Sequence, residues 1–235
     1  MKRTLVLGTV LLIGATTAAV VVAEQAAPAQ GRGGGGFTFP PMSPIVKVAG
    51  NVYMVAGEGG NTAVFVTANG VVLVDTKVEN NGQAILDEVR KVTDRPITHI
   101  VNTHTHFDHT GSNQFFPATV EIVAQENTAA NMRKMPVFQE AANKHGLPDR
   151  SYKDRMTLLN GNDAIDLYYF GAAHTNGDTF VVFRNAKVMH SGDAFARKGE
   201  GGVDASNGGS GVAYADTVTK ARANDQGRDH RDPRT

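Results

Sequence analysis

The stretch of residues 103–111, THTHFDHTG, places four potential metal ligands within six positions: His104, His106, Asp108 and His109. Zinc binds imidazole nitrogen and carboxylate oxygen, and a catalytic zinc keeps one position open for water. In an extended segment His104 and His106 point to the same side and can hold one ion. Asp108 and His109 lie further along the chain and can reach a second ion. Because the stretch follows an apolar run, it predicts a metal site at the end of a buried strand.

The composition limits both the ligands and the partners that this chain can use. With 235 residues, 41% of them hydrophobic, the chain is long enough to bury a core. It contains no cysteine, so His and carboxylate side chains must hold any metal, and a cysteine nucleophile is excluded. Lys plus Arg and Asp plus Glu both number 23. This balance favours a small-molecule substrate over nucleic acid and leaves the oligomeric state open.

The N-terminus has the pattern of an export signal. Two basic residues precede an apolar run from Leu5 to Ala23, which predicts a signal peptide over residues 1–23 and a mature chain that begins near Glu24. An uncleaved anchor is the alternative, because about 20 apolar residues can span a bilayer. The Ala-, Pro- and Gly-rich segment that follows favours cleavage. We therefore expect a periplasmic or secreted protein that leaves the membrane after cleavage.

The remaining chain divides into a linker, a folded domain and a tail. Residues 24–43 are rich in Gly, Pro and Ala and predict a flexible linker. The folded domain is expected over residues 44–223, followed by a tail over 224–235. Within the domain, residues 199–211 are rich in glycine and predict a mobile loop.

Hydrophobic periodicity predicts strands and helices in alternation within the domain. Short β-branched runs over residues 44–76 predict an antiparallel meander. Helical spacing follows, with Ile85, Val89 and Val92 on one face. Further elements are expected as strands at 97–102 and 118–124, a helix near 125–144, four strands within 156–193 and a helix at 212–223. This order indicates an α+β fold with two sheets and helices outside them.

Two later segments offer further metal ligands. His174 lies in a glycine-flanked turn just before a predicted strand, and Asp193 lies at the end of another. Loops at strand ends can hold a ligand rigidly and still expose it. Asp75, at the end of VVLVD, can hydrogen-bond the ligand stretch and support it. An ordinary strand-end turn is the other interpretation of Asp75.

In chain order, the segments VVLVDT, THTHFDHTG, GAAHTNGD and HSGDAF resemble the metallo-β-lactamase superfamily, over about Ile45 to Ala223. The H-x-H-x-D-H spacing is highly specific for that superfamily. The resemblance implies a four-layer αβ/βα sandwich with a dinuclear site, holding two zinc ions, at one edge. It also implies how the ligands divide: His104, His106 and His174 on the first metal, Asp108 and His109 on the second, and Asp193 bridging them.

The resemblance implies hydrolysis of a small-molecule acyl substrate by metal-activated water, with Asp108 orienting the water and accepting its proton. An aspartate in the setting of Asp193 is similar to thioesterases of the glyoxalase II type, esterases and lactonases. An ester, thioester or lactone is therefore favoured over a lactam. One alternative is an iron-dependent sulfur dioxygenase, which shares this motif set but uses a single iron. Another is a metal-binding remnant without turnover.

The superfamily pattern ends with a histidine in a short GH turn, and this sequence shows no such turn. His230 is expected to lie in a solvated tail rather than to act as the missing ligand. Codons for Asn224 to Thr235, read one nucleotide later, can spell the apolar strand TIKGVITVIPG and then begin a His codon. We therefore hypothesise a frameshift near residue 223, which would leave the sandwich incomplete in its C-terminal strand and helix. The nucleotide sequence tests this hypothesis.

Overall fold

The computed structural model describes residues 38–196 and 202–226. The predicted signal peptide, most of the linker, His230 and most of the tail lie outside the described residues. The chain divides into a unit over Met1–Gln30 and a second over Gly31–Thr235, and every described residue belongs to the second. Within the described ranges, no helix combines the length and the apolar character that crossing a membrane requires.

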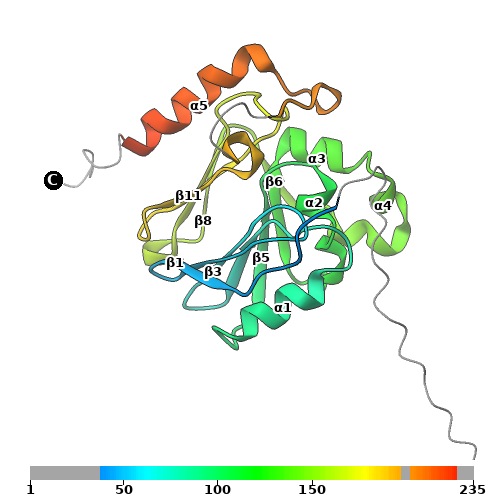
Figure 1. Ribbon diagram of the computed structural model, residues 1–235, viewed down its shortest axis with the longest axis vertical. Coiled ribbons are helices and arrows are strands. Elements are labelled where there is room, and N and C mark those ends of the chain that lie inside the picture. The colour runs from blue at the N-terminus through cyan, green and yellow to red at the C-terminus, as the bar shows by residue number, and fades with distance from the viewer. Residues whose placement is uncertain (1–37, 197–201, 227–235) are drawn as a thin grey trace, which may run out of the picture. The chain divides into compact units, whose positions relative to one another are not determined.

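The first sheet has seven strands in sequence order (Figure 1). The first four pair antiparallel, as the predicted meander requires, and the last four pair parallel. The strands are β1 Val46–Ala49, β2 Val52–Val55, β3 Thr62–Val66, β4 Val71–Val74, β5 Ile97–Asn102, β6 Glu121–Gln125 and β7 Arg150–Tyr152. The sequence did not predict β7, which has only three residues.

The second sheet has four antiparallel strands in the order β11-β10-β9-β8. They are β8 Arg155–Leu158, β9 Ile165–Tyr168, β10 Phe180–Phe183 and β11 Val188–His190. These strands lie close to the four predicted within 156–193. Both sheets therefore follow the order expected from the periodicity of the sequence.

The helices differ from the prediction in one segment. They are α1 Gly82–Arg90, α2 Phe107–Thr110, α3 Glu126–Met132, α4 Pro136–Gln139 and α5 Gly211–Gln226. The single helix expected near 125–144 is wrong: α3 and α4 are separate, and a 3₁₀ helix follows at Ala141–Gly146. Pro136 explains the break, because proline lacks an amide proton and pushes the preceding Met135 into an extended conformation. α1 also ends before Val92, which is half-buried just beyond it.

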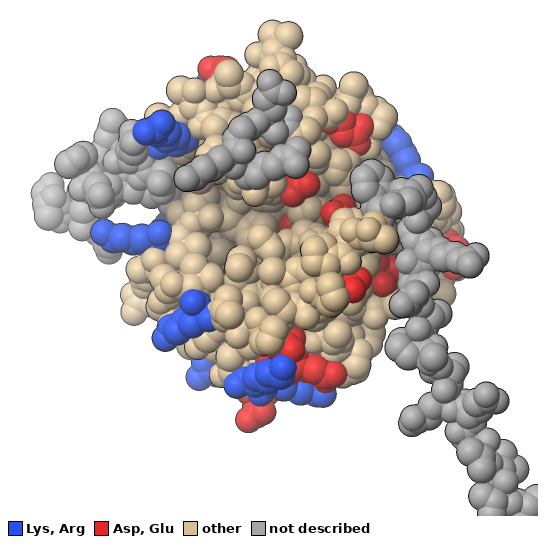
Figure 2. Space-filling model, viewed as in Figure 1, with Lys and Arg blue, Asp and Glu red and all other residues tan. Residues whose placement is uncertain are grey.

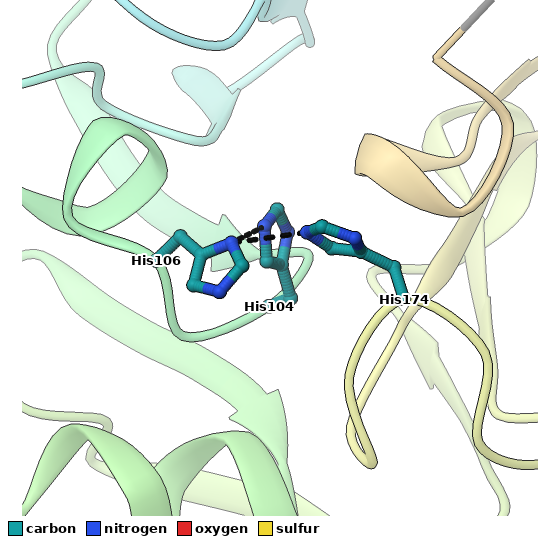
Figure 3. Close-up of side chains that lie close together, drawn as sticks. All are labelled: His104, His106 and His174. Atoms are coloured by element: carbon teal, nitrogen blue, oxygen red, sulfur yellow. Dashed lines mark hydrogen bonds between the residues drawn. The ribbon is translucent and has the colours of Figure 1, made fainter. Parts of the chain in front are cut away.

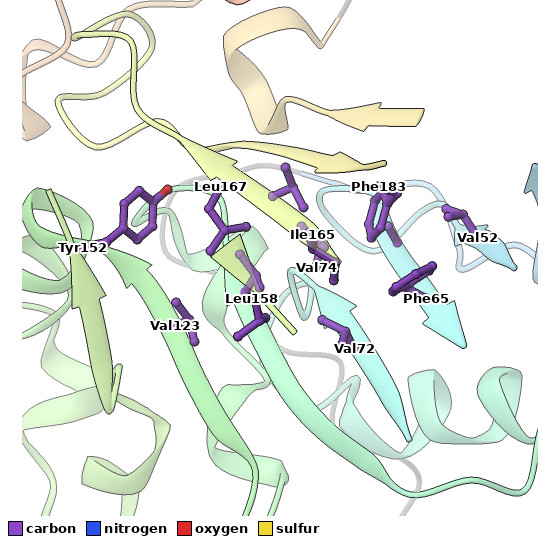
Figure 4. Close-up of a cluster of buried hydrophobic side chains, with 13 residues drawn as sticks. Val52, Phe65, Val72, Val74, Val123, Tyr152, Leu158, Ile165, Leu167 and Phe183 are labelled. Carbon is purple, nitrogen blue, oxygen red and sulfur yellow. The ribbon is translucent and has the colours of Figure 1, made fainter. Parts of the chain in front are cut away.

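Alternating side chains give the first sheet two apolar faces. Val72 and Val74 of β4 face the second sheet, where Phe65 and Phe183 pack with ring centroids 5.0 Å apart (Figure 4). Leu73, between them in sequence, packs with buried residues of α1 on the opposite face. The largest core therefore lies between the two sheets.

A third core covers the outer face of the second sheet. Tyr168, Phe180 and Val182 pack there with Ala221 of α5. The layers are thus α1, the first sheet, the second sheet and α5, as Figure 1 shows. This arrangement confirms the predicted αβ/βα sandwich.

Residues 38–43, placed in the linker by the sequence interpretation, are hydrogen-bonded to the domain. The amide of Ser43 donates to the carbonyl of Ala56 at 2.9 Å, and the amide of Glu58 donates to the carbonyl of Pro40 at 2.7 Å. These bonds attach the segment to the β2–β3 loop. On the face drawn in Figure 2, acidic side chains lie around a hollow near the middle, and most basic side chains lie at the margins.

Candidate metal centre

The candidate centre forms where loops from both sheets meet. β4 runs into Asp75 and β5 runs into Thr103, and the carboxyl ends of parallel strands lie at the same edge of a sheet. The amide of Thr179, at the start of β10, donates to the carbonyl of Thr103 at 2.8 Å and joins the second sheet to this edge. His174 lies in the β9–β10 loop, and Asp193 lies in the 3₁₀ turn after β11. The topology therefore brings all the predicted ligands to one place.

Three histidines converge at the first position (Figure 3). His104 Nε2 lies 3.1 Å from His106 Nδ1, and His174 Nε2 lies 3.0 Å from the same atom. Zinc–nitrogen bonds of about 2.0–2.1 Å in tetrahedral geometry would place ligand nitrogens about 3.3 Å apart. The three nitrogens are therefore spaced closely enough to share one ion.

In each of the three rings, the outer nitrogen, which is the one turned away from the other two histidines, has a hydrogen-bond acceptor. His104 Nδ1 faces the hydroxyl of Thr103 at 3.0 Å, His106 Nε2 faces Asp204 Oδ2 at 2.7 Å, and His174 Nδ1 faces the carbonyl of Gly202 at 2.8 Å. The Thr103 hydroxyl gives its proton to Asp75, so it accepts from His104. These bonds assign the ring protons to the outer nitrogens. The three inner nitrogens then direct lone pairs at one point, an arrangement that a bound cation stabilises.

A second group lies next to the first and shares His104 with it. His104, His109 and Asp193 form this group, and the rings of His104 and His109 lie 4.1 Å apart. His109 Nε2 is 3.3 Å from Asp193 Oδ1 and 3.8 Å from Asp108 Oδ2. That buried nitrogen has no hydrogen-bond partner among the described residues. A buried polar atom aimed at two carboxylates fits a metal ligand, so the residues present suit a second cation.

Asp75 accepts hydrogen bonds from the ligand stretch, residues 103–111, which confirms its predicted hydrogen bonding. Its Oδ1 accepts from the amide of Thr103 at 2.8 Å, and its Oδ2 accepts from the Thr103 hydroxyl and from His109 Nδ1, both at 2.7 Å. Both side chains of the His109–Asp75 pair are almost fully buried. Asp75 therefore fixes the ring of His109 with Nε2 turned towards Asp108 and Asp193.

The charges of the centre depend on one another. Burial opposes protonation of His109, but Asp75 and Asp193 outweigh it and raise its pKa to about 10. Burial, together with His109, holds the pKa of His104 well below its usual range. Burial raises the pKa of Asp193, but the interaction with His109 outweighs it and lowers that pKa. A metal that binds His109 must displace its Nε2 proton, so metal binding there releases a proton.

The sequence interpretation missed Asp204, which lies in the glycine-rich segment predicted to be a mobile loop. Residues 202–210 are instead anchored: Asp204 accepts from His106, and its amide donates to the carbonyl of His174 at 2.8 Å. Burial raises the pKa of Asp204, but bonds from Asn207, Ser206 and His106 hold it well below the usual range. The sequence DASN could have indicated a capped turn, because Asp often caps its own loop. Its partner His106 could not be read from the sequence.

Asp178 stabilises the turn that carries His174. Its carboxylate accepts from the amide of Thr175 at 2.9 Å and from the Thr175 hydroxyl at 2.7 Å. The Thr128 hydroxyl of α3 donates to the carbonyl of Gly177 at 2.8 Å. The glycine-flanked turn of His174 is thus closed by Asp178 and tied to α3.

His190, at the end of β11, is close to this centre but uses both ring nitrogens elsewhere. Its Nε2 faces the carbonyl of Asn61 at 3.0 Å, and its Nδ1 accepts from the amide of Gly192 at 3.2 Å. The two groups found among the described residues are His104, His106 and His174, and His104, His109 and Asp193. His190 therefore supports the turn that carries Asp193 and does not join either group.

A sandwich of this kind, with histidines and aspartates gathered at one edge, defines a class of metal-dependent hydrolases. The chain belongs to the metallo-beta-lactamase superfamily, whose family model matches residues 55–233. The crystal structure of the DIM-1 metallo-beta-lactamase has a TM-score of 0.66 at 18% identity, covering 80% of this chain and 86% of that one. A metallo-beta-lactamase from Pontibacter korlensis has a TM-score of 0.64 at 18% identity, covering 78% and 86%. These likenesses confirm the fold.

The curated relatives match this chain over only part of their own length. The chain is 27% identical over 171 residues to the uncharacterized protein YobT of Bacillus subtilis (strain 168), covering 68% of this chain and 66% of that protein. It is 25% identical over 166 residues to the 2,4-dinitroanisole O-demethylase subunit alpha of Nocardioides sp. (strain JS1661), covering 67% and 48%. A metallo-beta-lactamase type 2 of Bacillus sp. (strain 170) is 25% identical over 136 residues, covering 56% and 49%. The chain thus spans half to two thirds of these relatives.

Proposed function

We propose that this protein is a dinuclear zinc hydrolase that cleaves an ester, thioester or lactone. The observation that carries the proposal is the pair of ligand groups that share His104. His104, His106 and His174 are the ligands of the first zinc. His109 and Asp108, whose carboxylate lies 3.8 Å from His109 Nε2 and outside both groups, would hold the second. Asp193, a member of the second group, would reach both ions because it lies within 3.8 Å of both His109 and His174.

Two zinc ions bound there would supply a water with a pKa near neutrality and a Lewis acid for the substrate carbonyl. Residues of this chain would orient that water and accept its proton. Asp108 accepts a proton from the attacking water and orients the water so that a lone pair of the water oxygen points at the carbonyl carbon. Asp75 and Asp204 hold His109 and His106 in fixed orientations by accepting their outer ring protons. No serine or cysteine nucleophile is required.

The choice of acyl group rests on Asp193. A carboxylate in the bridging position resembles the thioesterase, esterase and lactonase branches of the superfamily more than the lactam-cleaving branch. An ester, thioester or lactone is therefore the proposed substrate, and a lactam is the less favoured one.

A substrate panel with defined metal content tests the proposal. The full chain is stripped with a chelator, reloaded with zinc, and assayed on an aryl ester, a thioester, a lactone and a chromogenic cephalosporin. We expect about two zincs per chain and hydrolysis that is lost on chelation and restored by zinc. One iron per chain with oxygen consumption would instead support the dioxygenase alternative. Bound metal without hydrolysis of any substrate in the panel would support the alternative of a metal-binding remnant that has no turnover.

Substitution of Asp108 tests its assigned role. We expect Asp108→Asn to lower kcat by about 10²–10⁴, the range typical of losing a general base. Asp87→Asn is the matched control, because Asp87 is an exposed carboxylate on α1 that pairs with its helix neighbours Arg90 and Gln83. Activity of Asp108→Asn equal to that of Asp87→Asn would contradict the mechanism.

A further inference from the structure

A strap over residues 38–43 precedes β1 and lies on the β2–β3 loop, residues 56–61. The Ser43 hydroxyl accepts from the amide of Ala56 at 3.1 Å, while the Ser43 amide donates to the carbonyl of the same residue at 2.9 Å. The two backbones also touch, because a Cβ at Gly57 would collide with the carbonyl of Pro41. The family model begins at residue 55, so the strap lies outside the part of the chain that this model matches.

The same loop contacts the ligand stretch through two consecutive glycines. The amide of Gly60 donates to the carbonyl of Asp108 at 2.9 Å. A Cβ at Gly59 would lie 2.6 Å from that carbonyl oxygen, and the φ of 103° at Gly59 also favours glycine. Side chains are therefore excluded where the loop meets the ligand stretch, and the backbone of Asp108 is in direct contact with the loop.

The strap also contacts the ligand stretch directly. Phe39 packs edge-on against Phe107, with ring centroids 6.1 Å apart, and the start of the described chain lies beside α2 in Figure 1. Phe107 immediately precedes Asp108. The next residue of the strap, Pro40, accepts from the amide of Glu58 in the loop at 2.7 Å. The strap, the loop and the ligand stretch thus contact one another in all three pairs, and these contacts together fix the backbone of Phe107 and Asp108.

We propose that the strap positions Asp108 in the second metal site, with Phe39 as the residue through which it acts. Phe39 acts through Phe107 and Asp108, so it is a positioning residue and not a catalytic one. The inference rests on the proposed dinuclear hydrolase function and adds to it a segment that the family model does not include.

The first metal site does not depend on the strap in this way. The outer nitrogens of His106 and His174 are held by Asp204 and by the carbonyl of Gly202. Neither acceptor belongs to the strap or to the β2–β3 loop. Displacement of the strap should therefore weaken the binding of the second zinc and leave that of the first zinc unchanged.

Phe39→Ser tests the inference on the full chain, with zinc as the probe. An aromatic pair contributes about two- to tenfold to an equilibrium constant. We expect the affinity of the second zinc to fall by about that factor in competition with a chromophoric chelator, and the affinity of the first to stay unchanged. His174→Ala removes a proposed ligand of the first zinc alone and so identifies which affinity belongs to that site. Phe39→Tyr keeps the ring and should keep both affinities of the parent.

Phe115→Ser is the matched control, because it also removes an edge-on ring pair, that of Phe115 and Phe116 with centroids 5.3 Å apart, outside the ligand stretch. Equal affinity for the second zinc in Phe39→Ser and Phe115→Ser would overturn the inference and leave the two-zinc centre standing. Equal losses at both sites in Phe39→Ser would show a general effect on the fold and would also contradict the positioning role. A parent chain that binds fewer than two zincs would overturn the inference together with the dinuclear function.

Discussion

At the scale of single residues, one buried carboxylate organises much of the centre. Asp75 accepts three hydrogen bonds, two from Thr103 and one from His109, and is itself fully buried. A buried charge of this kind is stabilised only by its partners. Its strand-end position predicted a supporting role, but the sequence did not specify its partner, because His109 lies 34 residues away.

Replacement of Asp75 should weaken the second metal more than the first. In Asp75→Asn a neutral amide replaces the carboxylate, so the proton of His109 Nδ1 loses its charged acceptor. We expect the affinity of the second zinc to fall about 10- to 100-fold, as for other residues that orient metal ligands. Competition with a chromophoric chelator measures the affinities of the first and of the second zinc. Asp87→Asn is the control. An unchanged affinity for the second zinc in Asp75→Asn would contradict the role of Asp75 in orienting His109.

At the scale of elements, the β2–β3 loop is pinned against the ligand stretch by a fully buried lysine. Lys77 Nζ donates to the carbonyls of Val55 and Gly57 at 2.8 Å and of Gly60 at 3.0 Å. Gly60 has no room for a side chain, since a Cβ there would lie 2.2 Å from the ring of His109. Burial lowers the pKa of Lys77 to about 8, against the opposing effect of Asp75. The loop therefore packs directly on the ring of His109.

Loss of this lysine should destabilise the whole domain. Lys77→Met leaves three carbonyls without their donor, and an unsatisfied buried polar group typically costs about 1–3 kcal/mol. We expect the free energy of unfolding to fall by about 3 kcal/mol in urea titrations. Lys91→Met, at an exposed position just after α1, should change it by less than about 1 kcal/mol because exposed ion pairs contribute little. A similar small change in both variants would show that Lys77 does not anchor the loop.

A cross-strand ion pair makes the second sheet sensitive to acid. Asp166 of β9 accepts from Arg184 Nε at 2.7 Å and from Thr157 at 2.7 Å. Burial raises the pKa of Asp166, but Arg184 and Thr157 outweigh it and lower that pKa to about 2. A carboxyl with a lowered folded-state pKa stabilises the fold above its unfolded pKa near 4, and this contribution is lost as the pH falls through about 2.

The acid sensitivity can be measured with Asp166→Asn. The shift in pKa corresponds to about 2 kcal/mol of stability between pH 5 and pH 2. We expect the difference in unfolding free energy between the parent and Asp166→Asn to shrink by about that amount over this range. Urea titrations at pH 5 and pH 2 test it. In Asp87→Asn, the change in unfolding free energy between these two pH values should equal that of the parent. A difference that stays constant with pH would rule out the linkage.

At the scale of the whole molecule, local patterns predicted most of the sandwich and its ligands. His104, His106, Asp108 and His109 could be proposed as ligands because their spacing is contained in one short stretch. The break at Pro136 was missed although proline itself is a local signal. Asp204 could not be found from spacing alone, because its bond to His106 joins residues 98 positions apart and exists only after both sheets have assembled.

The two-position centre is the central claim, and metal positions in a crystal test it most directly. Crystals of the zinc-loaded full chain would be measured on both sides of the zinc absorption edge to locate the metal by anomalous scattering. We predict two peaks, one bound by His104, His106 and His174 and the other by Asp108 and His109, with Asp193 between them. A single zinc peak at the three histidines, or zinc bound only elsewhere on the chain, would contradict the two-position centre.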